Sequence, residues 1–105
     1  MASDQKFVDF IIEQIDIPAQ ITAKKMFGEY GLYFGEKIVA LICDNKLFVK
    51  PTAAGRIFIK DVIEAAPYPG AKPSFLIEEQ LEDRDWLKEL IYITAKELPA
   101  PKPKK

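Results

Sequence analysis

The chain of 105 residues has no histidine, a single cysteine and no long apolar run. Without histidine it cannot form a Ser-His or Cys-His nucleophile pair, or a metal site with an imidazole ligand. Cys43 cannot form a disulfide within the chain, and a lone thiol is typical of a reducing compartment. No apolar stretch approaches the roughly 18 residues of a membrane span, and the N-terminus lacks the pattern of a secretory signal. We therefore expect a cytoplasmic protein that does not enter the membrane.

The net charge of −1 is unevenly distributed along the chain. The last seven residues hold three of the 15 Lys and Arg residues and none of the 16 Asp and Glu residues. Residues 1–98 therefore carry twelve positive against sixteen negative charges, a net charge of −4. Proteins that bind duplex DNA usually present a basic surface, because neutralising phosphates supplies much of their affinity. The charge thus argues against direct binding of duplex DNA by this part of the chain.

The length indicates one domain with its own hydrophobic core. We assign residues 1–98 to this domain. Residues 99–105 are rich in proline and lysine, and we expect this tail to be disordered or to adopt the polyproline II conformation.

Two short turn signals organise the middle of the chain into a meander of strands. Gly35-Glu36 places glycine where a type II′ turn requires a positive φ angle. Asp44-Asn45 consists of two residues that tolerate the left-handed conformation of a type I′ turn. The strands joined by these turns are Tyr30–Phe34, Lys37–Cys43 and Lys46–Lys50.

Periodicity and capping residues predict the remaining elements. A first helix begins near Asp4, after Ser3 as its N-cap, and ends before Pro18. A last helix begins after Asp83 and ends before Pro99. Between them we expect strands at Ile21–Phe27 and Ser74–Glu78, a helix at 53–65 and an irregular loop at 66–73. The predicted fold is α+β, a two-layer sandwich of helices on an antiparallel sheet in the order α-β-β-β-β-α-β-α.

Both faces of the predicted meander are apolar, so each should be covered. With unbroken pairing on either side of the turns, Leu32 lies opposite Val39 and Tyr30 lies opposite Leu41. We expect the first and last helices to cover the smaller aliphatic face, which carries Ala40, Ile42, Leu47 and Val49. The opposite face is the candidate interaction face and carries Tyr30, Leu32, Phe34, Leu41 and Phe48. It would be covered by the last helix, by a partner protein or by a second copy of the chain in a homodimer.

The sequence offers no convincing catalytic, metal-binding or cofactor-binding residues. Cys43 lies near the end of a strand that we expect to be buried, and no neighbour in the sequence would lower the pKa of its thiol. The carboxylates between Glu78 and Asp85 precede a helix, where they complement its dipole. We therefore predict that the protein is not an enzyme and needs no cofactor.

An alternative function is nucleic-acid binding. Aromatic side chains on a sheet can stack on bases while lysines contact phosphates, as in proteins that bind single strands. Here the basic tail could add to such a surface. The residues involved would be Tyr30, Tyr33, Phe34 and Phe48, with Lys46 and Lys50.

The run from Lys25 to Tyr33 resembles the N-terminal domain of the TfoX/Sxy competence regulators. The motif residues are Met26, Phe27, Gly28, Tyr30, Gly31 and Tyr33, followed by a turn, an apolar strand and Leu47-Phe48-Val49-Lys50. The resemblance extends over roughly residues 5–98 and implies a fold like that of type III secretion chaperones. It also implies regulation of natural competence genes together with a cyclic-AMP receptor protein. We therefore expect a regulatory module that binds a protein partner and modulates transcription through it.

Overall fold

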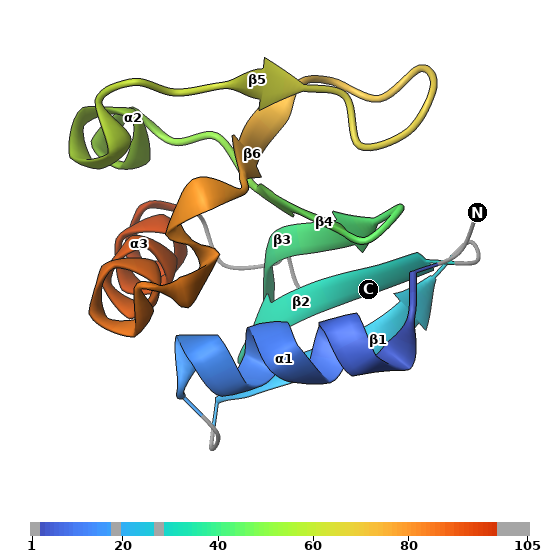
Figure 1. Cartoon of the computed structure of the whole chain (residues 1–105). Coiled ribbons are helices and arrows are strands. Elements are labelled where there is room, and N and C mark those ends of the chain that lie inside the picture. Colours follow the sequence, from blue (N-terminus) through green and yellow to red (C-terminus); the bar gives the residue numbers. More distant parts are fainter. Residues whose placement is uncertain (1–2, 18–19, 27–28, 99–105) are drawn as a thin grey trace, which may run out of the picture.

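The computed structural model describes residues 3–17, 20–26 and 29–98. Within these ranges it contains three α-helices, one short 3-10 helix and six strands (Figure 1). In chain order they are α1 (Gln5–Ile15), β1 (Ile21–Met26), β2 (Glu29–Phe34), β3 (Lys37–Cys43), β4 (Lys46–Val49), α2 (Ala53–Ile59), β5 (Glu64–Ala65), β6 (Ser74–Ile77), η1 (Glu79–Glu82) and α3 (Arg84–Glu97). The predicted α+β class and element order are confirmed, with β5 and η1 as additions. The predicted tail at 99–105 lies outside the described residues.

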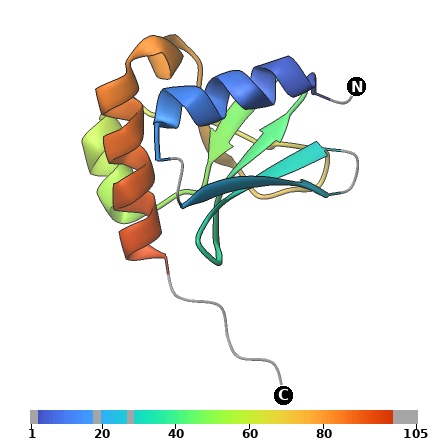
Figure 2. The same ribbon diagram turned by 90° about the horizontal axis from the view of Figure 1, so that it is seen from below.

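The strands form one antiparallel sheet in the order β1-β2-β3-β4-β6-β5. The helices lie on one side of this sheet (Figure 2). α1 contacts α3 and β1, and α3 also contacts α2 and β3. The core between the two layers contains Ala40, Ile42, Leu47 and Val49, as predicted for the aliphatic face. In the part of the chain that the structure describes, no helix has the length and apolar character needed to cross a bilayer.

Both predicted hairpin turns are confirmed. Asp44 and Asn45 have φ angles of 54° and 56°, as a type I′ turn requires. Gly35 has a φ angle of 63°, and its backbone N–H donates to the carbonyl of Gln20 at 2.9 Å. The two turns therefore fix the pairing at both ends of β3.

The predicted pairing between β2 and β3 is wrong beyond the turn, because the structure has a β-bulge there. Phe34 pairs with Lys37 as expected, but Leu32 pairs with Ala40 and Tyr30 pairs with Ile42. Val39 stands between the residues that pair with Leu32 and Tyr33, and it is the extra residue of the bulge. Beyond the bulge, the pairing of β2 with β3 is shifted by one residue. A one-residue shift places the side chains of β2 on the opposite face from the one that unbroken pairing predicts, relative to those of β3.

The candidate interaction face is therefore not one surface. Tyr30 and Leu32 lie on the helix-covered side and belong to the core. Phe34 packs against Tyr92 of α3, with ring centroids 5.5 Å apart and an edge-to-face geometry. Leu41 and Phe48, the remaining two of the five residues of the candidate interaction face, pair with each other on the opposite side of the sheet.

The helix predicted at 53–65 is shorter in the structure. Thr52 caps it as expected, since the hydroxyl oxygen of Thr52 accepts a hydrogen bond from the backbone N–H of Gly55 at 2.9 Å. The helix ends at Ile59, and Lys60 then has a φ angle of 73° and a ψ angle of −71°. The N–H of Asp61 donates to the carbonyl of Ile59 at 3.0 Å, which closes a three-residue γ-turn around Lys60. The chain can then return to the sheet as β5.

The γ-turn at Lys60 is strained, because a side chain with a Cβ atom rarely adopts this conformation. We expect Lys60→Gly to raise the free energy of unfolding by about 1 kcal/mol, measured by urea denaturation. Lys60→Ala is the matched control, because it removes the long exposed side chain but keeps the Cβ atom. An equal gain in both variants would show that the strain does not come from the backbone.

One of the two predicted helix N-caps is wrong and the other is confirmed. The N-cap of α1 is Asp4 and not Ser3, because the hydroxyl oxygen of Ser3 instead accepts a hydrogen bond from the N–H of Asn45 at 2.9 Å. The N-cap of α3 is Asp83, as predicted, and its carboxylate accepts from the N–H of Trp86 at 3.2 Å.

Candidate binding groove on the open face of the sheet

One side of the sheet, the open face, faces away from α1 and α3. Cross-strand pairing places Lys24, Gly31, Leu41, Phe48 and Leu76 in one row across it. Because paired residues point to the same side, the neighbouring rows of this face can be assigned in the same way. They contain Tyr33 with Ile38, and Cys43 with Lys46.

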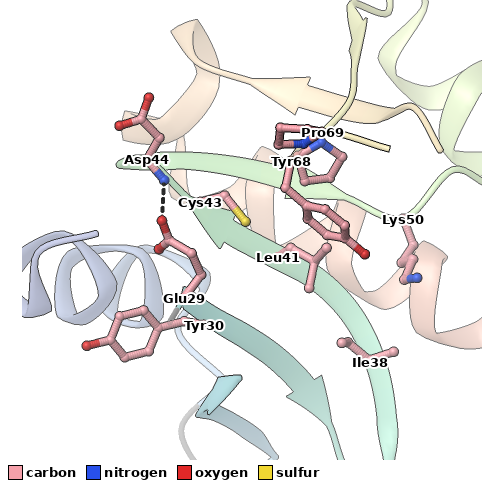
Figure 3. A pocket seen from close by; sticks show the side chains of 10 residues that line it. Glu29, Tyr30, Ile38, Leu41, Cys43, Asp44, Lys50, Tyr68 and Pro69 are labelled. Carbon is pink, nitrogen blue, oxygen red and sulfur yellow. Dashed lines mark hydrogen bonds between the residues drawn. The ribbon is translucent and has the colours of Figure 1, made fainter. Parts of the chain in front are cut away.

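The open face is hollowed by a groove of about 710 Å³ (Figure 3). Its floor is formed by β3, with Ile38 and Leu41 half-buried and Cys43 buried. All three are apolar or weakly polar side chains. The floor can therefore take up apolar groups but offers few strong hydrogen-bonding groups.

One wall of the groove comes from the loop between β5 and β6. Pro67, Tyr68 and Pro69 line it. Pro67 is buried, while Tyr68 is 55% exposed although it is a large aromatic side chain. The two flanking prolines restrict the backbone around Tyr68, so this segment loses less conformational entropy when it is ordered.

The ends of the groove carry charged side chains. Glu29 and Asp44 lie at the end where β3 meets the turn to β4, and Lys50 lies toward the opposite end near Ile38 (Figure 3). The N–H of Lys50 donates to the carbonyl of Val39 at 2.9 Å, which ties it to the beginning of β3.

Glu29 joins three segments that are far apart in the sequence. One oxygen of its carboxylate accepts from the N–H of Ser3 at 2.9 Å, and the other accepts from the N–H of Asp44 at 3.0 Å. The N–H of Asp4 also donates to the side-chain oxygen of Asn45 at 2.8 Å. Partial burial raises the pKa of Glu29, but the hydrogen bonds from Asp44 and Ser3 outweigh it and hold the pKa below its ordinary value. The carboxylate is therefore a structural anchor for the start of the chain.

Cys43 has the opposite electrostatic environment. Burial raises the pKa of its thiol, and the negative charge of Glu29 raises it further. The thiolate is the nucleophilic form of cysteine, so this environment keeps the side chain in its unreactive form. The burial predicted for Cys43 is confirmed, since the residue is 4% exposed.

The four aromatic residues of the predicted base-stacking surface do not share an exposed face. Tyr30 is only 8% exposed, and its hydroxyl donates to the side-chain oxygen of Gln5 at 3.2 Å. Phe34 packs on α3, and Phe48 is nearly buried. Tyr33 lies on the open face, with the ammonium group of Lys24 5.0 Å from the centre of its ring.

Sequence reasoning missed two of the residues that shape the groove, Glu29 and Tyr68. The partners of Glu29 are distant in the sequence, so no local pattern indicated its role. Tyr68 lies in a segment predicted correctly as an irregular loop, and the run Pro-Tyr-Pro was the available signal of a rigid exposed aromatic residue.

Fold and groove together define a small α+β module with helices on one side of its sheet and a groove on the other. The TfoX N-terminal domain model matches residues 13–98, and the chain belongs to this family. An uncharacterized 12.7 kDa protein in the trpE 5′ region of Spirochaeta aurantia is 40% identical over 105 residues. The match covers 100% of this chain and 91% of the relative.

The family motif contributes to both sides of the sheet. Tyr30 packs in the core, while Gly31 and Tyr33 lie on the open face. Met26 is the last residue of β1. Phe27 and Gly28, the other two residues of the motif, lie outside the described residues.

Proposed function

We propose that the chain is a non-enzymatic regulatory module that binds a protein partner through the groove on its open face. The observation that carries this proposal is an apolar groove walled by an exposed tyrosine, on the side of the sheet that the helices leave uncovered. Membership of the TfoX N-terminal domain family supports a regulatory role. We further propose that the partner is a transcription regulator.

Two observations favour binding over catalysis. The thiol of Cys43 has a raised pKa, which disfavours the nucleophilic thiolate. The carboxylate of Glu29 has a lowered pKa and already accepts two backbone hydrogen bonds, so it is a weak general base. The two reactive groups nearest the floor of the groove are thus poorly suited to chemistry.

The character of the groove favours a protein as ligand. Tyrosine is enriched among the residues that dominate protein interfaces, because it adds a large contact area and has few rotatable bonds. Tyr68 is such a residue, and it lines the same groove as the apolar side chains of Ile38 and Leu41, with its ring near Leu41 (Figure 3). These residues could form the centre of a small interface.

The test compares partner capture by the wild-type protein and by Ile38→Lys, which places a charge on the floor of the groove. Ile57→Lys is the matched control, because Ile57 is 76% exposed on α2 and is not among the residues that line the groove. A protein captured from a lysate of the source organism is identified, purified and titrated against all three proteins by calorimetry. We expect Ile38→Lys to weaken binding at least about tenfold, the equivalent of 1.4 kcal/mol, and Ile57→Lys to bind as the wild type does.

Circular dichroism and sedimentation of the three proteins complete this test. Each variant should keep the fold of the wild type, so that weaker binding can be attributed to the groove. Equal binding by Ile38→Lys and the wild type would contradict the proposal. A wild-type dimer that dissociates on Ile38→Lys would show that a second copy of the chain occupies the groove instead of another protein.

A further inference from the structure

The groove has opposite charges at its two ends. β3 runs along its floor from Ile38 to Cys43, with Glu29 and Asp44 at one end and Lys50 toward the other. Leu41 lies between them. A ligand that matches this surface needs a positive group, an apolar group and a negative group in that order.

We propose that the groove binds an extended segment of the partner in which a basic, an apolar and an acidic residue alternate with other residues. This inference rests on the proposed function and specifies the chemistry of the partner. In an extended chain, every second side chain points to the same side and residues rise by about 3.3 Å. Positions i, i+2 and i+4 then span about 13 Å. Ile38 to Cys43 covers about the same length, because Val39 is the extra residue of the bulge and only about four regular steps remain.

The acidic end retains capacity for a positive ligand. Each oxygen of Glu29 accepts one backbone hydrogen bond, and a carboxylate can accept about four in total. Asp44 is exposed in the turn and adds a second negative charge. Lys46 is also exposed and pairs with Cys43 at this end, but it is not part of the groove lining.

The basic end suits a carboxylate. Lys50 is half-buried, and its backbone is fixed by the hydrogen bond to Val39. Between the two ends, Leu41 and the ring of Tyr68 offer an apolar site for a side chain such as leucine. Because the prolines on both sides of Tyr68 restrict the backbone of this wall, binding requires less ordering of the backbone there.

Fluorescence anisotropy with labelled seven-residue peptides tests the proposal at low ionic strength, where screening of exposed charges is weak. The peptides are Gly-Lys-Thr-Leu-Thr-Glu-Gly and three analogues whose charged pair is Lys/Lys, Glu/Glu or Gln/Gln. We expect the wild-type protein to bind the Lys/Glu peptide at least about fivefold more tightly than each analogue, because each analogue loses one or both of the exposed ion pairs.

Charge reversal in the protein provides the sharper comparison. Lys50→Glu is expected to change the preference, so that the Lys/Lys peptide binds most tightly. Asp44→Asn removes a negative charge but keeps a residue type that tolerates the left-handed conformation at this turn. It should reduce the gain in affinity that a peptide obtains from a basic residue at the acidic end of the groove. Lys6→Glu on α1 is the matched control, because Lys6 is exposed on the helix side of the sheet and should leave the order of affinities unchanged.

The outcomes separate this inference from the proposed function. Equal affinity for all four peptides, with binding lost in Ile38→Lys, would overturn the charge pattern but leave the groove as the binding site. The same conclusion follows if no peptide binds while binding of the purified partner is still weakened by Ile38→Lys. A change of preference in Lys6→Glu equal to that in Lys50→Glu would show that net charge, and not the groove, sets the order.

Discussion

Leu32→Ala is expected to lower the free energy of unfolding by about 3 kcal/mol, whereas Leu41→Ala should cost about 1 kcal/mol or less. The difference follows from the β-bulge at Val39. Leu32 has no exposed surface and packs in the core under the helices, so its truncation leaves a cavity. Leu41 is half-buried on the open face, where solvent can fill the space that the shorter side chain leaves.

Urea denaturation of the wild type and the two variants measures this difference. The two substitutions remove the same atoms, so any difference in cost reflects the positions and not the chemistry. An equal cost at both positions would mean that Leu32 and Leu41 lie on the same side of the sheet, as unbroken pairing would place them. That result would contradict the bulge.

The turns at both ends of β3 could be predicted from the sequence, but the bulge between them could not. Register is specified by pattern only where one face is apolar and the other polar. Here Leu32 and Tyr33 are both apolar or aromatic, and so are Ala40, Val39 and Ile38 opposite them. A shift by one residue therefore leaves the pattern acceptable, and packing of the helices decides between the two registers.

The groove could not be predicted from the sequence, because its shape depends on pairing between segments that are far apart in the chain. The loop at 66–73 was predicted, but its position against the open face follows from β5 pairing with β6 at Glu64 and Phe75. That pairing is possible only because α2 ends at Ile59 and the γ-turn at Lys60 redirects the chain. The sequence of 53–65 is as compatible with a longer helix, since neither glycine nor proline marks its end.

Glu29→Gln is expected to lower the free energy of unfolding by about 2 kcal/mol at neutral pH. The carboxylate accepts hydrogen bonds from the N–H groups of Ser3 and Asp44, and bonds to a charged acceptor are stronger than those to a neutral one. Glutamine has one acceptor oxygen, and its NH₂ group would face an N–H donor. The variant therefore loses at least one bond, and its attachment of the N-terminal segment to the turn at Asp44 is weakened.

The cost of Glu29→Gln should depend on pH in a defined direction. Because the folded protein holds the pKa of Glu29 below its ordinary value of 4.5, folding favours the ionised carboxylate. This contribution is complete above pH 4.5 and is lost as the pH falls below 4.5 and through the pKa of the folded protein. Other carboxylates titrate in the same range, but they are common to the wild type and the variant, so the difference in stability isolates Glu29.

Urea denaturation of the wild type and Glu29→Gln between about pH 3 and pH 7 should thus give a difference in the free energy of unfolding that shrinks in acid. Glu36→Gln in the other hairpin turn is the control, since Glu36 is exposed there. A difference for Glu29→Gln that stays constant across this range would show that its carboxylate is not bound in the ionised form.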